Sequence, residues 1–367
     1  NAIVFRERRE RSLQRGQQMT TFKAYQVHTV GGKPVCKFEQ LTMDDLDPGD
    51  VVIKTAYSAI TYKDAMAARG VGKNVRTDRP CVTGVDLSGV VVSSVDPRFH
   101  EGDKVVVTNY KLGVNQDGGY ADYARVPGDW IVPLPDGLDL YEAMGLGTSG
   151  LTAALAVDRL EKAGLKPEDG VMGISGATGG VGSLAVDMFA KRGFEVAAIS
   201  GKAEQEPFLK KIGAKRIVSR QELLADKAPL APPLFAGALD NVGGEFFDRL
   251  AARLQPYGKL AVAGMAVGAE LNTTVLPWVL RAIDVLGINV SRQLHMAERK
   301  RLWKRMATDL KPNHLAEISR PIPFEKLDEV MDQFFNVTVV GRIVVEVGSK
   351  APKSASQDTR VLERQKS

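Results

Sequence analysis

The sequence predicts an α/β protein in which a β-rich domain carries an inserted unit of alternating strands and helices. Short β-branched segments broken by Gly, Pro and Asp fill residues 19–146, whereas apolar strands alternate with helix-length segments over residues 147–310. Such alternation is typical of right-handed βαβ units around a parallel sheet. An apolar run at residues 341–347 predicts a strand that returns to the first domain, which would then comprise residues 19–146 and 311–348.

Length and composition fit about two globular domains. The chain has 367 residues, of which 44% are hydrophobic and 25% charged, values typical of globular proteins rather than disordered or fibrous ones. No apolar run reaches the ~20 residues that span a bilayer, so we predict no membrane partner. The cysteines, Cys36 and Cys81, form no CxxC pair, which argues against a disulfide framework and favours a cytoplasmic location.

Positive charge gathers at the two ends of the chain. The formal net charge is +5, but residues 1–18 and 349–367 are both rich in Lys and Arg, so the body between them is nearly neutral. A nucleic-acid-binding protein normally carries its basic surface on the folded domain. We therefore predict no nucleic-acid partner, and we predict that both ends are disordered tails.

Turn residues precede two expected strands of the first domain. Pro48-Gly49-Asp50 lies before the β-branched run at residues 51–55, and Glu101-Gly102-Asp103 lies before the run at residues 104–107. Gly, Pro and Asp favour turns that lead into strands. With a further run at residues 89–92, the first domain is predicted to be β-rich and barrel-like.

In the second domain the expected elements follow one another closely. Strands are expected at residues 171–175, 195–200, 216–219, 237–240, 259–263 and 285–289, and helices at residues 181–192, 204–212 and 246–254. This order predicts a doubly wound parallel sheet, whose ligands bind at the carboxyl ends of the strands.

The strongest local signal is the glycine-rich segment Ser175-Gly176-Ala177-Thr178-Gly179-Gly180-Val181-Gly182, which follows an apolar strand and opens a helix. Glycines at 176, 179 and 182 permit a tight turn and a close approach of the backbone to a pyrophosphate. The unpaired N–H groups of a helix N-terminus also favour phosphate. We predict that this segment binds a dinucleotide, with a purely structural turn as the alternative.

The tip of the next strand indicates which dinucleotide binds. NAD-binding proteins usually place an acidic residue there for the ribose 2′-hydroxyl group, but this strand ends in Ser200-Gly201-Lys202. A hydroxyl and an ammonium group suit a 2′-phosphate, which a carboxylate would repel. Arg220, after the third strand, is a candidate second cation. We therefore predict NADPH/NADP+, the alternative being that Lys202 and Arg220 are solvated loop charges.

No metal motif is present in the sequence. The 4 histidines lie far apart, and none has HExxH or HxxxH spacing, so we predict no metal site. The hydroxyl-rich run Thr148-Ser149-Gly150-Leu151-Thr152 is interpreted as the N-cap region of a helix rather than as a catalytic site.

Several unusual strings occur together in this chain. They are Tyr57-Ser58-Ala59-Ile60-Thr61-Tyr62-Lys63-Asp64, Pro80-Cys81-Val82-Thr83-Gly84-Val85-Asp86, Asp96-Pro97-Arg98-Phe99, Gly128-Asp129-Trp130, the glycine-rich segment and Ser200-Gly201-Lys202. With them, the chain from about residue 19 to residue 347 resembles the YhdH/YhfP-type quinone oxidoreductases of the zinc-free medium-chain dehydrogenase/reductase superfamily. This branch includes acryloyl-coenzyme A reductase.

The resemblance implies a GroES-like β-barrel-type catalytic domain with an inserted Rossmann domain over residues 147–310, bound NADPH, no zinc and a homodimer. Zinc-dependent relatives carry a Cys near the position of Thr61 and Gly-His-Glu where Gly84-Val85-Asp86 stands. The resemblance places Tyr62 beside the nicotinamide ring. The remaining cofactor contacts that it implies are Gly176, Thr178, Gly179, Gly180, Val181 and Gly182 at the pyrophosphate, Ser200, Gly201, Lys202 and Arg220 at the adenosine phosphate, and Met265 and Arg342 in the cleft.

We predict hydride transfer from NADPH to the electron-poor C=C bond of a quinone, an enone, or an acryloyl or other enoyl thioester. Tyr62 is the candidate catalytic residue, which would polarise the substrate carbonyl or protonate the α-carbon. The alternative for Tyr62 is a buried aromatic with a satisfied hydroxyl group. The alternative for the protein is an NADPH-binding sensor or structural component without turnover. Thr61, in place of the Asn usual before Tyr-Lys-Asp, keeps that alternative open.

Overall fold

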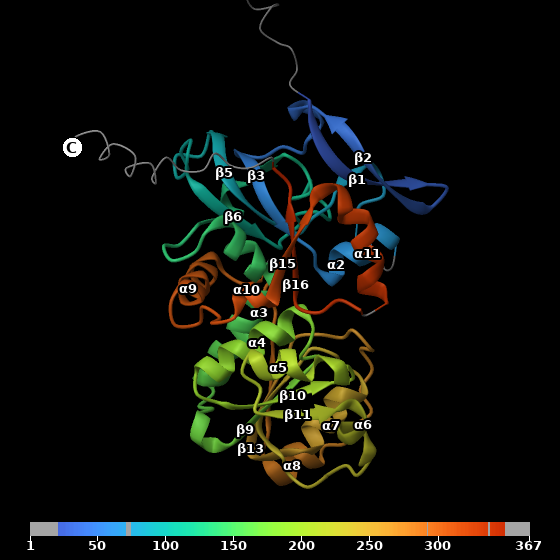
Figure 1. Cartoon of the computed structure of the whole chain (residues 1–367), viewed down its shortest axis with the longest axis vertical. Helices are drawn as coiled ribbons and strands as arrows, with labels where there is room; N and C mark the ends of the chain where they lie inside the picture. Colours follow the sequence, from blue (N-terminus) through green and yellow to red (C-terminus); the bar gives the residue numbers. More distant parts are fainter. Residues whose placement is uncertain (1–20, 71–74, 292, 337, 349–367) are drawn as a thin grey trace, which may run out of the picture.

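The computed structural model describes residues 21–70, 75–291, 293–336 and 338–348, which form two halves stacked along the long axis of the molecule (Figure 1). One half combines the N-terminal strands with the two C-terminal strands, and the other holds the strands from the middle of the chain. The tails predicted at residues 1–18 and 349–367 lie outside the described residues.

The first half contains two sheets. A 3-stranded antiparallel sheet, in the order β2-β1-β4, consists of β1 (Phe22–Val30), β2 (Lys33–Leu41) and β4 (Cys81–Val82). A 7-stranded sheet consists of β3 (Val51–Ala59), β5 (Asp86–Ser94), β6 (Lys104–Thr108), β7 (Tyr123–Val126), β8 (Ile131–Pro133), β15 (Ser319–Pro323) and β16 (Arg342–Glu346). Because β16 pairs antiparallel with β3, the last described strand belongs to the sheet of the N-terminal half.

The local sequence explains where these strands begin. β3 starts directly after Pro48-Gly49-Asp50, and β6 starts after a turn in which Gly102 has a φ of 93°. That φ lies in the left-handed region, which glycine adopts without steric strain. Val51 and Ile53 on β3 are fully buried, since alternate residues of a strand face the same side of the sheet.

The second half is a 6-stranded sheet in which every neighbouring pair is parallel. Its strands are β9 (Val171–Ser175), β10 (Glu195–Ser200), β11 (Arg216–Ser219), β12 (Phe235–Asp240), β13 (Leu254–Val262) and β14 (Asp284–Gly287). The connecting helices are α4 (Gly180–Lys191), α5 (Glu206–Lys211), α6 (Arg220–Ala225), α7 (Glu245–Ala252) and α8 (Leu276–Arg281). The order β11-β10-β9-β12-β13-β14 is that of a doubly wound dinucleotide-binding sheet.

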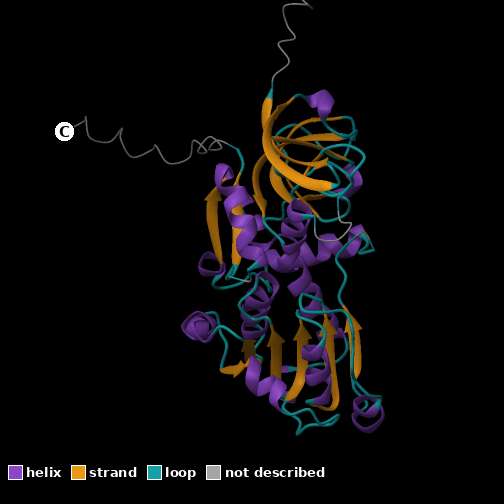
Figure 2. Cartoon of the chain, turned by 90° about the vertical axis from the view of Figure 1, so that its right-hand side faces the viewer, coloured by secondary structure: helices purple, strands orange, loops and turns teal. Residues whose placement is uncertain are grey.

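The carboxyl ends of these parallel strands point toward the first half of the molecule, as the arrowheads in Figure 2 show. The strand order reverses between β9 and β12, so the loops after these two strands diverge to opposite sides of the sheet. A crevice opens at such a reversal, and ligands of doubly wound proteins bind there. The fold therefore directs the predicted glycine-rich segment toward the junction of the two halves.

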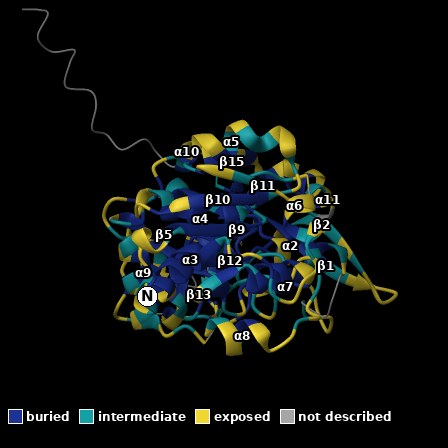
Figure 3. Cartoon of the chain, turned by 90° about the horizontal axis from the view of Figure 1, so that it is seen from below, coloured by how far each residue is buried: buried dark blue, intermediate teal, exposed yellow. Residues whose placement is uncertain are grey.

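Three helices occupy the junction: α3 (Leu140–Lys162), α9 (Met296–Ala307) and α10 (Leu315–Ile318). The domain boundary expected at residue 147 falls inside α3, where Gly147 breaks the helix with φ 50° and ψ −152°. One hydrophobic cluster runs from Ala59 and Val106 in the first half to Ile174 and Leu184 in the second. In Figure 3 the buried residues fill this centre, whereas the periphery, including α5 and α8, is exposed.

Two short helices complete the first half: α2 (Tyr62–Arg69) and α11 (Leu327–Phe335). No helix in the described ranges is long and apolar enough to cross a lipid bilayer.

Candidate active site

The glycine-rich segment forms the loop between β9 and α4. Gly176 has a φ of 59°, and a Cβ atom at Gly182 would lie only 2.2 Å from the carbonyl oxygen of Gly176. Both positions therefore require glycine. Gly179 is the N-cap of α4 and Gly180 its first residue, so the N–H groups of the first helical turn face the junction without a side-chain cap. This arrangement is suited to binding a phosphate group.

The tips of β10 and β11 lie side by side at one corner of the same edge. Ser200 pairs with Ser219, and the backbone N–H of Lys202 donates to Ser200 Oγ over 3.0 Å. A Cβ atom at Gly201 would lie 3.9 Å from Cβ of Arg220, the first residue of α6. The structure thus brings the four residues predicted at the adenosine phosphate into one place.

The two cations at this corner differ in their surroundings. Lys202 Nζ donates a hydrogen bond to the carbonyl oxygen of Val339 over 3.0 Å, and burial lowers the pKa of this ammonium group. The guanidinium of Arg220 lies over the ring of Phe246, 5.6 Å from its centroid. A phosphate would compete with a backbone carbonyl for Lys202 but would approach the exposed Arg220 directly.

Tyr62 is the first residue of α2, and its side chain is 44% exposed. The alternative interpretation of Tyr62 as a buried aromatic is therefore wrong. Thr61 caps the helix, since its N–H and hydroxyl groups both donate to Asp64 Oδ2, over 2.8 and 2.7 Å. The other oxygen of Asp64 accepts from Val85 N over 2.9 Å, and burial raises the pKa of this carboxyl group to about 6.

A line of polar contacts runs from the residue after Tyr62 into the interior. Lys63 Nζ donates to Asn109 Oδ1 over 3.2 Å, and Asn109 Nδ2 donates to Thr148 Oγ1 over 3.4 Å. Thr148 in turn donates its hydroxyl and backbone N–H to the two oxygens of Asp86, over 2.5 and 2.8 Å. The run from Thr148 thus does begin a helical segment, but the capping carboxylate comes from β5.

Sequence reasoning did not find Asn109, Thr148 or Asp86 as members of one site. Asn109 has a φ of 66°, which is uncommon for a residue with a side chain. Neither that backbone conformation nor the contacts has a local sequence signal, because the residues are separated by tens of positions in the chain.

The last two predicted cofactor residues, Met265 and Arg342, differ in how far they are exposed. Met265 lies beyond β13 and is 72% exposed, so burial does not prevent it from contacting a ligand. Arg342 is buried, at 2% exposure, and its guanidinium donates to backbone carbonyls that include those of Gly145 and Ile60. The geometry therefore does not support a direct contact of Arg342 with a cofactor.

The residues at the positions of zinc ligands do not fit a catalytic zinc ion. Thr61 donates its hydroxyl to Asp64, and Val85 offers no ligand atom. Both oxygens of Asp86 accept hydrogen bonds from Thr148. Catalytic zinc requires about three ligands from His, Cys or carboxylate groups, and the described residues contain no cluster of that kind.

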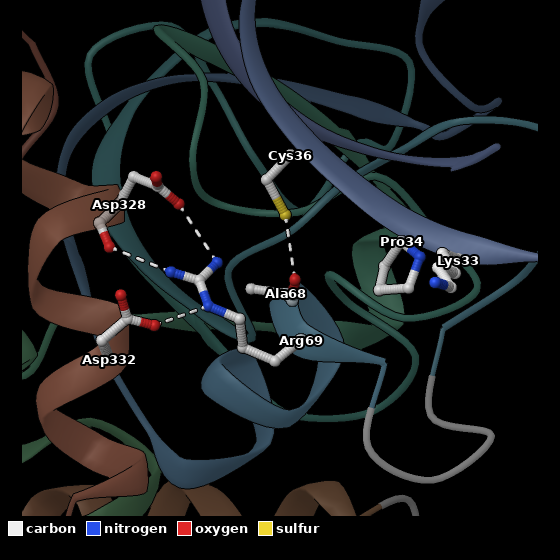
Figure 4. A pocket seen from close by; sticks show the side chains of 7 residues that line it. All are labelled: Lys33, Pro34, Cys36, Ala68, Arg69, Asp328 and Asp332. Atoms are coloured by element: carbon white, nitrogen blue, oxygen red, sulfur yellow. Dashed lines mark hydrogen bonds and ion pairs between the residues drawn. The ribbon is translucent and has the colours of Figure 1, made fainter.

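A separate pocket of about 470 Å³ lies between β2, α2 and α11 (Figure 4), and no residue of the glycine-rich loop lines it. Its lining consists of Lys33, Pro34, Cys36, Ala68, Arg69, Asp328 and Asp332. Arg69 is ion-paired with both aspartates, Nη1 to Asp328 at 3.2 Å and Nε to Asp332 at 2.7 Å. Because these charges satisfy one another, we assign the pocket no role in the chemistry.

A barrel-like half joined to a doubly wound sheet, with a glycine-rich loop aimed at the junction, defines a medium-chain dehydrogenase/reductase. Family models agree: that of the alcohol dehydrogenase GroES-like domain matches residues 47–136, and that of the zinc-binding dehydrogenase matches residues 180–308.

Individual relatives indicate which branch of this superfamily the chain belongs to. The "Putative quinone oxidoreductase YhfP" of Bacillus subtilis is 42% identical over 330 residues, which cover 89% of this chain and 99% of that protein. The acrylyl-CoA reductase AcuI of Ruegeria pomeroyi is 40% identical over 319 residues, covering 87% of this chain and 96% of that protein. Among solved structures, the crystal structure of the yhdH oxidoreductase from Salmonella enterica in complex with NADP superimposes with a TM-score of 0.85. The sequences of the two chains are 39% identical, and the match covers 89% of this chain and 100% of that one.

The chain therefore belongs to the quinone oxidoreductase and acrylyl-CoA reductase branch of the zinc-free medium-chain dehydrogenases/reductases. The family and the fold predicted from the sequence are confirmed.

Proposed function

We propose that this protein is an NADPH-dependent, zinc-independent oxidoreductase that transfers hydride to the activated C=C bond of a quinone, an enone, or an acryloyl or other enoyl thioester. One observation carries the proposal. The uncapped, glycine-lined N-terminus of α4 and the corner formed by Ser200, Gly201, Lys202 and Arg220 lie on the same carboxyl edge of the sheet, which faces Tyr62's half of the molecule. The relatives named as quinone oxidoreductase and acrylyl-CoA reductase support this reaction class.

The choice of NADPH over NADH rests on this chain's own residues. Related structures have been determined with NADP and, for Bacillus subtilis yhfP at 42% identity, with NAD. In the present chain β10 ends at Ser200, where NAD-binding proteins usually carry a carboxylate. A hydroxyl group followed by a lysine, with Arg220 beside them, favours the additional phosphate.

Each residue would have a distinct task. NADPH supplies the hydride when it is bound. The N–H groups of the α4 N-terminus would hold the pyrophosphate, while Lys202 and Arg220 would hold the 2′-phosphate. The hydroxyl group of Tyr62, a residue that is 44% exposed, would donate a hydrogen bond to the substrate carbonyl and then a proton to the α-carbon. Since the donor set does not fit zinc, such preorganised hydrogen bonds must stabilise the developing negative charge.

An acceptor screen tests the proposal. NADPH oxidation is followed by absorbance with acryloyl and crotonyl thioesters, quinones and enones, each with and without a strong chelator. We expect oxidation that survives chelation and that falls about 10²–10⁴-fold in Tyr62→Phe. The control Tyr257→Phe changes a tyrosine that is 74% exposed on β13, and it should keep full activity.

The opposite result identifies the alternative. Tight NADPH binding without oxidation by any acceptor would support a sensor or structural protein and contradict the reductase.

The prediction of a cytoplasmic location stays a prediction.

We also propose a homodimer. Among the described residues, eight exposed large apolar residues lie in the segment that follows β13 and on β14 itself: Met265, Val267, Leu271, Val275, Leu276, Val279, Leu280 and Val285. Exposed apolar side chains that gather in one segment favour an interface. The neighbouring β14 is the terminal strand of its sheet, so a second copy could pair with the same edge about a twofold axis.

Light scattering after gel filtration tests the dimer. Val279, which is 71% exposed, is replaced by Asp, and the control is Val95→Asp at a residue that is 84% exposed in the other half. We expect a dimeric wild type and a dimeric control but a monomeric Val279→Asp variant. A monomeric wild type at micromolar concentration would contradict the proposal.

A further inference from the structure

A buried ion pair lies at the break in helix α3, between the two halves of the molecule. Asp86 Oδ2 and Arg342 Nη2 are 3.9 Å apart, and their side chains are 0% and 2% exposed. A Cβ atom at Gly147 would lie 2.5 Å from that oxygen of Asp86 and 2.9 Å from Nη2 of Arg342. The two charges therefore fill the space beside the broken turn, and only glycine fits there.

The sign of each charge matches the helix end that it faces. Arg342 donates to the last carbonyls before the break, Nε to Gly145 over 3.1 Å and Nη2 to Met144 over 3.4 Å. Asp86 accepts from Thr148 N, the first amide after the break, over 2.8 Å. Carbonyl ends of helices favour cations and amide ends favour anions. The pair thus satisfies the backbone groups that the break leaves without helical partners.

The same guanidinium reaches toward both parts of the candidate active site. Its Nη1 donates to the carbonyl of Ile60 over 3.1 Å, directly before the cap of the Tyr62 helix. On the other side, a Cβ atom at Gly180 in the glycine-rich loop would lie 3.1 Å from Cδ of Arg342 and 3.4 Å from its Nη1. The preceding residue, Gly341, donates its N–H to the carbonyl of Thr178 in that loop over 2.9 Å.

Arg342 is fully engaged inside the protein. Each of its guanidinium nitrogens donates a hydrogen bond to a protein acceptor, Nη1 also to Ser149 Oγ over 3.0 Å. The planar fork of arginine permits such contacts in several directions at once.

We propose that Asp86 and Arg342 are positioning residues, a buried clasp across the break in α3 that fixes the separation between Tyr62 and the glycine-rich loop. The importance of that separation rests on the proposed function, since hydride transfer depends on the distance between the substrate and the cofactor that these two elements hold. A residue that bound the cofactor itself would affect its affinity, whereas the clasp affects the geometry of the bound state.

Arg342→Lys and Asp86→Asn test the clasp. Lysine keeps the charge but has a single ammonium nitrogen, which cannot bridge Ile60 and the α3 carbonyls together. We expect the Kd for NADPH to stay within about 3-fold of wild type while single-turnover hydride transfer slows about 10- to 100-fold. The primary isotope effect with deuterated NADPH should increase. Asp86→Asn, which preserves the shape of the side chain, should change the same quantities in the same direction.

The matched control is Arg320→Lys. Arg320 lies on β15, the strand parallel to β16, and it is exposed. It should leave affinity, transfer rate and isotope effect unchanged.

Amide hydrogen exchange supplies a readout without turnover. Both clasp variants should accelerate exchange in peptides that cover residues 144–150 and residues 178–182, whereas Arg320→Lys should not. This measurement tests the clasp even if the wild type reduces no acceptor, so failure of the proposed function and failure of the clasp are distinguishable.

Two results would overturn the clasp. A Kd for NADPH raised 10-fold or more, with unchanged transfer at saturation, would make Arg342 a cofactor ligand. Unchanged transfer and unchanged exchange would show that the pair positions nothing. If Arg342→Lys does not fold, Asp86→Asn decides by the same measurements.

Discussion

Replacing Arg220 by alanine should shift the cofactor preference from NADPH toward NADH. Arg220 lies against Gly201 at the tip of β10, and its guanidinium is exposed to an incoming phosphate. Lys202, by contrast, donates to the carbonyl of Val339 over 3.0 Å, and burial lowers the pKa of its ammonium group. Binding a phosphate would require Lys202 to exchange one acceptor for another, so we expect Arg220 to contribute more.

The size of the effect follows from the charges. Two unit charges about 4 Å apart attract each other by ~1 kcal/mol in bulk water and by ~4 kcal/mol near a protein surface. A hydrogen bond to a charged group contributes about 1.5–3 kcal/mol net. Because Arg220 is exposed and solvent screens its charge, the upper value of ~4 kcal/mol does not apply. A loss of ~1–3 kcal/mol corresponds to a fall of about 5- to 150-fold in the preference for NADPH.

The assay compares kcat/KM for NADPH and for NADH with one fixed acceptor at low and high salt. The ratio should fall in Arg220→Ala, fall less in Lys202→Ala, and stay constant in Arg216→Ala. Arg216 is the control because it begins β11, at the opposite end of the strand, and forms an exposed ion pair with Glu195. High salt should reduce the difference between wild type and Arg220→Ala, since salt screens exposed charges.

A ratio in Arg220→Ala within 2-fold of the wild-type ratio would refute this reasoning. An equal fall in kcat/KM with NADPH and with NADH would also refute it, because the effect of the substitution would then not lie at the 2′-phosphate. A wild type that prefers NADH would overturn the cofactor assignment itself.

Three further substitutions have effects that the structure determines. Gly182→Ala places a Cβ atom 2.2 Å from a backbone oxygen of the same loop. This variant should lower the free energy of unfolding by about 1–3 kcal/mol and remove the thermal shift caused by NADPH. The control is Gly287→Ala, which should do neither, since its Cβ atom would meet no described atom within 4 Å. Burial raises the pKa of Asp64 from 3.8 to about 6, so its contribution to stability is complete below about pH 4 and is lost as the pH rises through about 6. The free energy of unfolding of Asp64→Asn relative to wild type should therefore rise by up to about 3 kcal/mol between pH 4 and pH 7 in urea titrations, and a constant difference would contradict the cause given for the pKa. Arg76→Met removes the cation that the buried Asp47 and Asp117 share, so it should lower the free energy of unfolding by about 3–5 kcal/mol. The control Arg98→Met removes an exposed arginine and should lower it by only about 0–1 kcal/mol. Equal losses in the two variants would refute the distinction between buried and exposed ion pairs.

Elements with strong local patterns could be predicted closely. The strands expected at residues 171–175, 195–200 and 216–219 have those bounds in the structure, because short apolar runs between turn residues determine both their type and their length. The glycine-rich loop was predictable for the same reason, since its steric requirements concern neighbours within a few residues. The predicted boundary at residue 147 coincides with a helix break rather than a linker, which the sequence pattern did not indicate.

Roles that depend on distant partners could not be predicted. The family resemblance placed Arg342 in the cofactor cleft, yet tertiary packing buries its guanidinium group against the carbonyls of α3 and Ile60. Tyr62 could be exposed or buried as judged from its sequence, and the structure shows that it is 44% exposed.

The amino-acid sequence by itself determined the family, the parallel sheet, the glycine-rich loop and the basic corner at the tip of β10, because each depends on backbone sterics and charges within short segments. The tertiary structure alone decided which charges are available to a ligand. Lys202, Asp86 and Arg342 are all polar in the sequence, but their hydrogen-bond partners come from segments tens to hundreds of residues away. Whether a charge binds a ligand or the protein depends on burial and on those partners, and both arise only when the two halves pack together.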